Sequence, residues 1–324
     1  MSSLTLDKYA KEVEQDHLAV LGSICWYSIK ECRVDHPIIM QLLTDHGIGT
    51  LLIPKYPTDG NTFRRVTTDA KRNRHPIPDR TDVYENYFVR DLDGRGGKTI
   101  LRRLVCEQVD ANGKKLGYTN VMDIEFYRES GMVVTRMLPE CIDIHQRNIG
   151  YTMAREIKDE YVLWRGKLGS YAIREFVRRV VVSLGGTSVR DSGAVYFVPD
   201  ASSDKIKALK DFINDIPGDS SMVIVPLPDD REQRTMLKRA FQAETVGEID
   251  AAMVEIMKAQ NEAKQKGKKP SKTIADNFLK QFGDMVGRTK NYQSLLEDEL
   301  HEIETRIPLF QKMVLTLSAE AERG

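Results

Sequence analysis

The chain has no excess of charge of either sign, few cysteines and no long apolar run. Lys and Arg together number 48, as do Asp and Glu. No overall field therefore favours nucleic acid or an anionic membrane, and any basic site must be local. No apolar run approaches the roughly 20 residues that cross a bilayer, and the acidic, polar N-terminal segment is unlike a signal peptide. We expect a cytoplasmic protein without membrane contact.

Motifs for catalytic, metal or cofactor chemistry are also missing. No cysteine pair has C-x2-C spacing, and reduced, buried thiols are the favoured interpretation for Cys25, Cys32, Cys106 and Cys141. No histidines form H-x-x-x-H or H-x-H, and His145 near Asp143 and Cys141 is a grouping that chance often produces. No G-x-S-x-G or G-x-G-x-x-G follows a predicted strand. We predict no catalytic residue, metal or cofactor, although an enzyme is not excluded.

One stretch, from Gly94 to Thr99, looks like the end of a phosphate-binding loop. The full motif needs glycine at position 92, where the chain has Leu92, and it needs a helix after Thr99, where the sequence has strand chemistry. The glycines are better explained as turn residues between two strands. We predict that this stretch does not bind nucleotide and that Lys98 is a solvated side chain.

Residues 82–139 carry the clearest strand signal. Four segments are rich in branched and aromatic residues and are separated by turn sequences: Val83–Arg90, Thr99–Val109, Leu116–Tyr127 and Met132–Leu138. Short turns between such segments predict an antiparallel β-meander. Its apolar face needs a cover, which flanking helices can supply.

The region before this meander, residues 1–81, is predicted to be mainly helical. Residues 4–22 form an amphipathic helix ending at Gly22, and residues 24–29 are a buried strand or the start of a helix. A second helix begins near Pro37. Residues 54–78 are a connector with one short helix around Phe63.

Residues 141–228 are predicted to form a helix-hairpin-helix-strand unit. A helix to Trp164, an amphipathic helix at 171–184 and a hairpin at 187–198 follow the order of a winged-helix module. In that interpretation phosphates or bases would contact Arg174, Arg178, Arg179 and Arg190. The alternative is an ordinary solvated helix face, because Glu175 interrupts the arginines.

The last third, residues 229–324, is predicted to consist of long helices joined by a basic linker at 264–272. Apolar residues there alternate at spacings of four and three: Leu296, Leu300, Ile303, Ile307, Phe310, Val314 and Leu317. Such a heptad seam keeps one apolar stripe facing a partner helix. Two interpretations remain open, an antiparallel hairpin within the chain and a coiled coil between subunits. Pro308 is expected to kink the helix.

Several short stretches together resemble a known family. They are Trp26-Tyr27-Ser28-Ile29 with Cys32-Arg33, Leu52-Ile53-Pro54, Phe63-Arg64-Arg65, and the run from Gly193 to Pro199. The chain resembles a family of uncharacterised phage and bacterial proteins along most of its length. The resemblance implies a prokaryotic or phage origin, and it carries no activity and no catalytic residues.

These observations predict an α+β protein in which an antiparallel meander at 82–140 is flanked by helices. The leading functional hypothesis is a non-enzymatic structural or adaptor protein that self-associates, as a homo-oligomer, or docks a protein partner through its C-terminal helices. The alternative is a nucleic-acid-binding protein that uses residues 150–198.

Overall fold

The computed structural model describes residues 19–49, 52–78, 80–92, 97–190 and 194–322. The fold is α+β, as the sequence predicts. The chain divides into two compact units: unit 1 comprises Met1–Lys30, Gln41–Ile53 and Ile173–Gly324, and unit 2 comprises Glu31–Met40 and Pro54–Ala172. Each unit therefore draws on separate stretches of sequence, unlike the consecutive regions 1–81, 82–140, 141–228 and 229–324.

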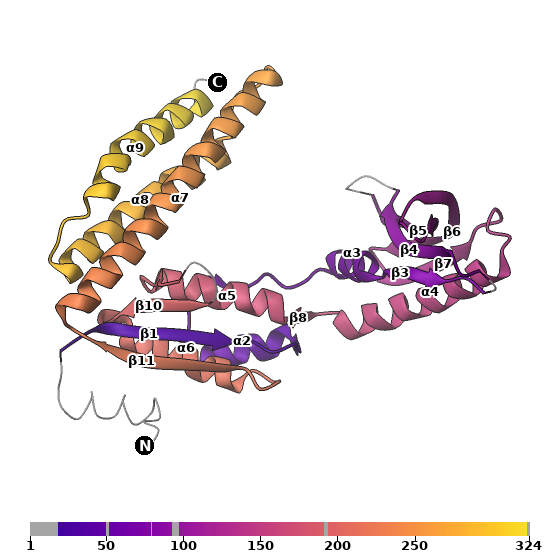
Figure 1. Cartoon of the computed structure of the whole chain (residues 1–324), viewed down its shortest axis with the longest axis horizontal. Helices are drawn as coiled ribbons and strands as arrows, with labels where there is room; N and C mark the ends of the chain where they lie inside the picture. The colour runs from indigo at the N-terminus through magenta and orange to yellow at the C-terminus, as the bar shows by residue number, and fades with distance from the viewer. Residues whose placement is uncertain (1–18, 50–51, 79, 93–96, 191–193, 323–324) are drawn as a thin grey trace. The chain divides into compact units, whose positions relative to one another are not determined.

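Unit 2 is built on a five-stranded antiparallel sheet with strands in sequential order (Figure 1). Its strands are β3 (Arg72–Pro76), β4 (Val83–Asp91), β5 (Thr99–Asp110), β6 (Lys115–Tyr127) and β7 (Met132–Met137). The predicted four-strand meander is confirmed, and β3 adds an edge strand. β3 went unpredicted because its sequence, RNRHP, has no apolar alternation.

Two helices cover the apolar face of this sheet, α3 (Asp59–Asp69) and α4 (Ile144–Trp164). The ring of Phe63 on α3 stacks on Phe126 of β6 at 5.1 Å, and Tyr161 of α4 meets Phe126 edge-on at 5.6 Å. Asp143 caps α4 by accepting the backbone N–H groups of its first turn. The two-stranded sheet of β2 (Arg33–Asp35) and β8 (Lys167–Gly169) completes the unit.

The first part of unit 1 is a four-stranded antiparallel sheet in the order β11-β1-β10-β9. Its elements in chain order are β1 (Val20–Ser28), α5 (Ser170–Ser183), β9 (Thr187–Ser188), β10 (Val195–Pro199), α6 (Ser203–Asp215) and β11 (Ser221–Pro228). This is a split β-α-β topology. The hairpin that the winged-helix interpretation used as an exposed wing supplies β10 to the interior of this sheet.

Strand β1 differs from the predicted helix ending at Gly22; residues 1–18 lie outside the described part of the chain. β1 pairs with β10 on one side and β11 on the other, so sheet partners decide its conformation. Gly22 lies where the sheet is most crowded, because a Cβ there would come within 2.2 Å of the Val198 carbonyl oxygen. The helix near Pro37 is present as α2 (His36–Asp45).

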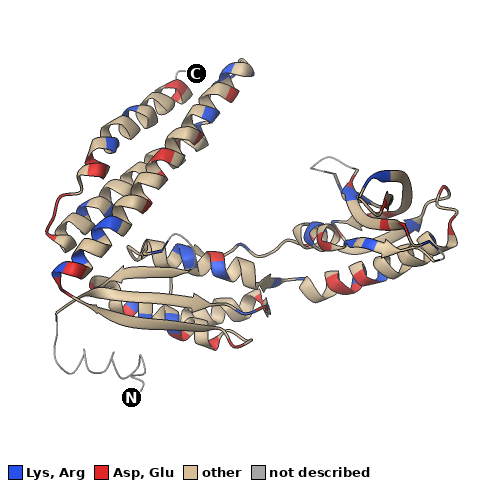
Figure 2. Cartoon of the chain, viewed as in Figure 1, with Lys and Arg blue, Asp and Glu red and all other residues tan. Residues whose placement is uncertain are grey.

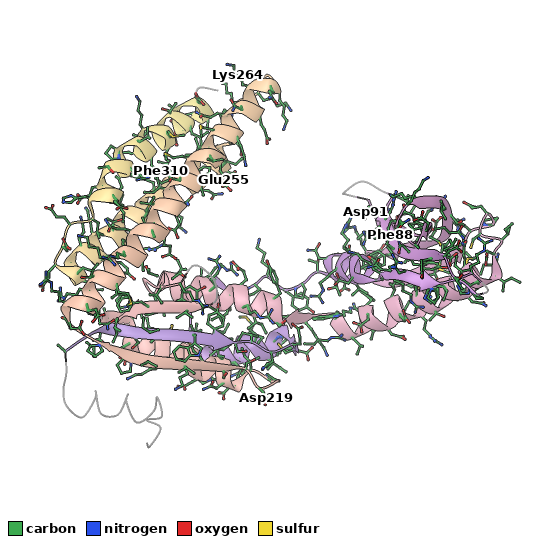
Figure 3. All side chains as sticks on the ribbon, viewed as in Figure 1. Phe88, Asp91, Asp219, Glu255, Lys264 and Phe310 are labelled. Carbon is green, nitrogen blue, oxygen red and sulfur yellow. The ribbon has the colours of Figure 1, made fainter. Side chains whose placement is uncertain are left out.

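The second part of unit 1 is a bundle of three helices, α7 (Arg231–Gln265), α8 (Lys272–Leu296) and α9 (His301–Glu322). Helix α9 packs along both α7 and α8, whereas α7 and α8 touch each other little (Figure 1). Phe310 of α9 is fully buried and meets Phe282 of α8 edge-on at 5.7 Å (Figure 3). Within the described residues the bundle is closed by contacts inside one chain.

The predicted heptad seam is therefore divided between two helices rather than carried by one. Leu296 is the last residue of α8, Glu297 adopts the left-handed conformation, and Leu300 precedes α9. Six of the seven seam residues are buried and Ile307 is partly buried in the same core. The seam residues thus pack against one another in a bundle of three helices of one chain.

Tyr292 of α8 packs between the helical bundle and the four-stranded sheet. Its ring stacks on Phe241 of α7 at 3.9 Å and meets Phe197 of β10 edge-on at 6.3 Å. Its hydroxyl donates a hydrogen bond to the Gly185 carbonyl at 2.8 Å. Burial raises the pKa of this phenol above its usual range. The contacts make the sheet and the bundle one packed unit.

Candidate functional site

A groove with a volume of about 1520 Å³ runs along unit 1. Its lining comes mainly from α5, α7 and α8, with further residues from the start of β1, from Leu52 and from residues 199–202. On α8 the lining residues extend from Asn277 to Leu295. Because an α-helix rises about 1.5 Å per residue, this wall is about 27 Å long. The groove has the length of a short helix or an extended peptide.

Several small residues line the groove among polar and charged ones. Ala251 and Ala252 contribute from α7, and Gly283 and Gly287 contribute from α8 one helical turn apart. Apart from the adjoining residues and backbone of α8 itself, no atom of the described residues lies within 4 Å of the Cβ position of either glycine. Glycine inside a helix costs about 1 kcal/mol relative to alanine. No internal packing requires these glycines, and their effect is to leave the groove open.

The two sides of the groove carry different charges. Glu248 and Glu255 line it from α7, while Arg178 and Arg179 line it from α5. Helix α8 contributes Lys280, Asp284 and Arg288, of both signs. Figure 2 shows basic and acidic residues interspersed along the bundle helices, and Figure 3 labels Glu255 on α7. The groove is therefore polarised across its width without being strongly charged overall.

An ion-pair cluster joins the two helices near the sheet. The Arg288 guanidinium lies 3.1 Å from the Glu244 carboxylate and 3.3 Å from that of Glu248. Burial raises the pKa of Glu244, and Arg288 and the Ser188 backbone N–H partly oppose that shift. Because all three side chains are at least partly shielded from solvent, this cluster holds α7 and α8 at a fixed separation where the groove meets the sheet.

The four arginines of the nucleic-acid alternative differ in their surroundings. Arg178 and Arg179 line the groove, but Arg178 forms a bidentate pair with Glu175 at 2.7 and 3.1 Å. Arg174 is half-buried and donates to the Ile29 carbonyl at 2.9 Å. Arg190 is exposed beside residues 191–193, which lie outside the described part. Nucleic-acid binding by this set stays a prediction.

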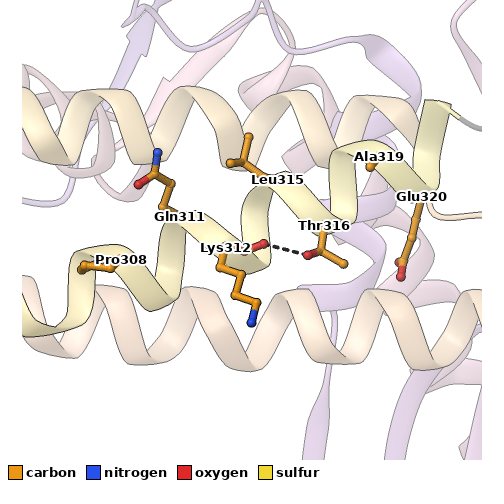
Figure 4. A pocket seen from close by; sticks show the side chains of 7 residues that line it. All are labelled: Pro308, Gln311, Lys312, Leu315, Thr316, Ala319 and Glu320. Atoms are coloured by element: carbon orange, nitrogen blue, oxygen red, sulfur yellow. Dashed lines mark hydrogen bonds between the residues drawn. The ribbon is translucent and has the colours of Figure 1, made fainter.

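The seven residues assigned to oligomerisation lie in the bundle core instead of on a free surface. The outer face of α9 carries a shallower pocket of about 510 Å³ with Leu315 exposed at its edge (Figure 4). Helix α9 continues through Pro308, which lines this pocket. Because α9 alone supplies the lining, this pocket offers a partner only one wall.

Unit 2 contains a buried polar network that the sequence did not reveal. The Glu85 side chain is 1% exposed and accepts hydrogen bonds from the Tyr87 hydroxyl at 2.5 Å, Gln146 Nε2 at 2.8 Å and Gln108 Nε2 at 3.1 Å. Gln146 belongs to α4, and the other three belong to the sheet. The network therefore anchors the start of α4 to the sheet.

Two histidines, His75 and His145, lie next to the Glu85 carboxyl group of this network. The rings of His75 and His145 stack at 5.6 Å, and His145 Nε2 lies 3.6 Å from the Glu85 carboxyl group. Burial lowers the pKa of His75, with His145 and Arg72 adding to that effect. Nearby Cys106 and Cys141 are buried thiols whose pKa values are raised, mainly by burial. High thiol pKa values make them poor nucleophiles near neutral pH.

Other predicted features are placed as follows. Residues 93–96 of the suspected phosphate loop lie outside the described part, Lys98 is exposed, and Thr99 begins strand β5 rather than a helix. Among the described residues, no three His, Cys, Asp or Glu side chains are placed to hold a metal ion. Within the same residues no helix is long and apolar enough to span a bilayer.

Comparison with known proteins gives one match, to a family model over residues 20–323. The chain belongs to this family, which is described as a family of unknown function (DUF6744). No curated protein and no solved structure matches it. The expected resemblance to an uncharacterised family is thereby confirmed.

Proposed function

We propose that this chain is a cytoplasmic adaptor that docks an amphipathic helix of a partner protein in the groove between α7 and α8. The groove is the observation that carries the proposal, because it is helix-lined, about as long as five helical turns, and floored by small residues. A fourth helix placed there would complete a four-helix arrangement, a common way of burying apolar stripes.

The charges across the groove favour a particular kind of helix. Glu255 on the α7 side suits a basic side chain, whereas Arg179 on α5 and Lys280 on α8 suit acidic ones. A docked helix with one basic and one acidic flank would meet opposite charges on both sides. Its apolar stripe would face Ala251 and Leu295, which line the groove and are not fully buried.

The proposal revises the hypothesis of self-association through the heptad seam. The seam residues pack in the core of the three-helix bundle. The proposed docking surface is therefore the side of α7 and α8 that α9 leaves uncovered. No disulfide joins the four cysteines, all of which lie in the described part of the chain, and this agrees with a reducing compartment such as the cytoplasm.

Selection from a displayed library of 18-residue amphipathic helices tests the proposal. The full chain serves as bait, and selected peptides are then measured against three variants, Gly283→Leu, Gly287→Leu and Gly247→Leu. All three glycines are inside helices with open space at the Cβ position, but Gly247 does not line the groove. We expect at least about a tenfold loss of affinity for the two groove variants and none for the control, since about 1.4 kcal/mol corresponds to a factor of ten.

The outcome that contradicts the proposal is equally specific. Selected peptides that bind Gly287→Leu as tightly as the unchanged chain would dock elsewhere. In that case a second selection against the Leu315 face of α9, using Leu315→Asp, would locate the true surface.

A further inference from the structure

Helix α4 covers the sheet of unit 2 with one side and leaves a row of residues exposed on another (Figure 1). Its buried residues, such as Met153 and Ile157, pack in the core of the unit. Six exposed residues elsewhere on the helix follow one another at spacings of four, three, four, three and four: Ile144, Asn148, Tyr151, Arg155, Lys158 and Val162. This alternation keeps them on one side of an α-helix, as in a coiled coil. We call these six residues the α4 seam.

Three residues of the α4 seam are large apolar side chains in contact with solvent. The exposed fraction is 74% for Ile144, 54% for Tyr151 and 70% for Val162. Ile142, two residues before Ile144, is 84% exposed. Scattered exposed apolar residues are normal on a protein surface. Here, however, they share one side of one helix at heptad spacing, which is the pattern of a helix that packs on a second helix.

The α4 seam is symmetric about position 153. Positions 144 and 162 lie nine residues to either side of it, positions 148 and 158 lie five, and positions 151 and 155 lie two. A second α4 that packs antiparallel, centred at the same position, therefore places each seam residue opposite its mirror position in the partner. The arrangement has two-fold symmetry, so every contact between the two copies occurs twice.

The apolar and aromatic residues of the α4 seam are complementary to their mirror positions. Ile144 meets the partner's Val162, which buries an apolar pair at each end of the α4 seam. Tyr151 meets the partner's Arg155 near the centre, where a guanidinium over the ring gains a cation–π contact. The two ends and the centre of the α4 seam therefore all gain from contact with a second copy.

Two cations weaken this complementarity on one flank of the α4 seam. Lys158 lies opposite the partner's Asn148, whose amide oxygen can accept a hydrogen bond from the ammonium. In the antiparallel arrangement, however, the partner's Arg147 comes to the same flank as Lys158, and like charges brought together oppose association. Because the contact surface is also a single pair of helices, at the low end of interface sizes, we expect a dissociation constant on the order of 10–100 µM.

We propose that two copies of this chain associate through the α4 seam as an antiparallel pair. A second copy is the favoured occupant because the apolar ends and the central ring of the α4 seam match its own mirror positions. The proposal goes beyond the docking function and does not depend on it. If each copy also docks a partner helix, the pair carries two grooves, and a partner with two docking helices is held more tightly than by one copy.

Sedimentation equilibrium of the full chain, from about 1 to 200 µM, tests the proposal through the dissociation constant of the dimer. Tyr151→Ala should weaken the dimer at least about tenfold, because the lost ring occurs twice in the interface. Tyr171→Ala is the matched control, since Tyr171 is 78% exposed near the start of α5, outside the α4 seam. This variant should leave the dissociation constant unchanged.

Lys158→Glu tests the orientation of the two helices. In the antiparallel pair it places a carboxylate instead of an ammonium beside the partner's Arg147, so the dimer should become at least about threefold tighter. A parallel pair sets position 158 against itself and gains nothing from this reversal. Gly287→Leu in the groove of unit 1 should leave the dimer unchanged.

The contradicting results are equally specific. A chain that stays monomeric at about 200 µM overturns the proposal. Equal effects of Tyr151→Ala and Tyr171→Ala overturn it too, because the contact then lies outside the α4 seam. A dimer that Lys158→Glu does not tighten lacks the antiparallel arrangement. A dimer that Gly287→Leu disrupts is held by the groove, with a second copy in the place of the partner helix.

Discussion

The Glu85 network allows a sharp prediction about stability. Replacing Glu85 with Met keeps the volume of the side chain but removes the acceptor of three hydrogen bonds. Gln108 is only half-buried and can turn to water, but Tyr87 and Gln146 are buried and would lose their partner. A buried donor left unsatisfied costs about 1–3 kcal/mol. Glu85→Met should therefore destabilise unit 2 by about 4 kcal/mol.

Glu85→Gln is the informative comparison. Its carbonyl oxygen can take the place of Oε1 and accept from Gln108 and Gln146, while its amide donates to the Tyr87 hydroxyl oxygen, which both donates and accepts. Only the Tyr87 O–H loses its acceptor, against two buried donors for Glu85→Met, so we expect a smaller loss of about 1 kcal/mol. Glu129→Gln in an exposed turn is the control, and its effect should stay within about 0.5 kcal/mol.

Urea denaturation followed by tryptophan fluorescence measures these changes unit by unit. The chain has two tryptophans, Trp26 in unit 1 and Trp164 in unit 2, so a Trp26→Phe background reports unit 2 alone. With an m-value of about 2 kcal/mol/M, the midpoint should fall by about 2 M for Glu85→Met and about 0.5 M for Glu85→Gln. Equal shifts for the two variants would refute the reasoning, because loss of acidity rather than loss of the acceptor would then dominate.

Three further predictions follow from single contacts. Tyr292→Phe keeps the stack on Phe241 but removes the bond to the Gly185 carbonyl, and should lower the stability of unit 1 by about 1–2 kcal/mol, measured through Trp26 in a Trp164→Phe background. Gly22→Ala places a Cβ 2.2 Å from the Val198 oxygen and should cost about 3 kcal/mol or more in the same assay, so an unchanged midpoint would contradict the register of β1. The pKa of His75 in the folded chain lies below its ordinary value of 6.5, so protonation of this ring favours unfolding. The free energy of unfolding of unit 2 should therefore fall as the pH drops below about 6.5, and it should level off below the folded pKa. The His75→Gln variant should show a weaker dependence on pH over this range.

The sequence was most informative where local pattern and tertiary structure agree. The strands from Val83 to Met137 have alternating apolar residues and short turns, so hairpin pairing could be predicted from neighbouring residues alone. Helix α5 shows its buried face directly in the spacing of Ile173, Phe176, Val177 and Val180. A short helix was also expected around Phe63, where α3 lies.

The strand partners of β1 and the residues that line the groove could not be predicted from local sequence patterns. The sheet partners of β1 lie beyond residue 194, so nothing near Gly22 could distinguish a strand from a helix end. The break between α8 and α9 has no glycine or proline, and the four-three spacing continues through it from Leu296 to Leu300. The groove lining comes from elements that lie far apart in the sequence, and the Glu85 network joins residues up to 61 positions apart. From the sequence alone, Gly287 is only an unfavourable residue inside a helix, and nothing nearby indicates that it lines a groove.

The insertion of unit 2 between β1 and α5 has a consequence for the order in which the chain acquires structure during synthesis. Strand β1 leaves the ribosome early, but its neighbours β10 and β11 end at Pro199 and Pro228. At about 5–20 residues per second, β1 waits roughly 10–40 s for both of its neighbours. Meanwhile Pro54–Ala172 of unit 2 can fold by sequential hairpins, since its contacts are local. The apolar side chains of Ile24 and Trp26 remain without sheet partners throughout that interval, which makes β1 the segment most in need of protection in the nascent chain.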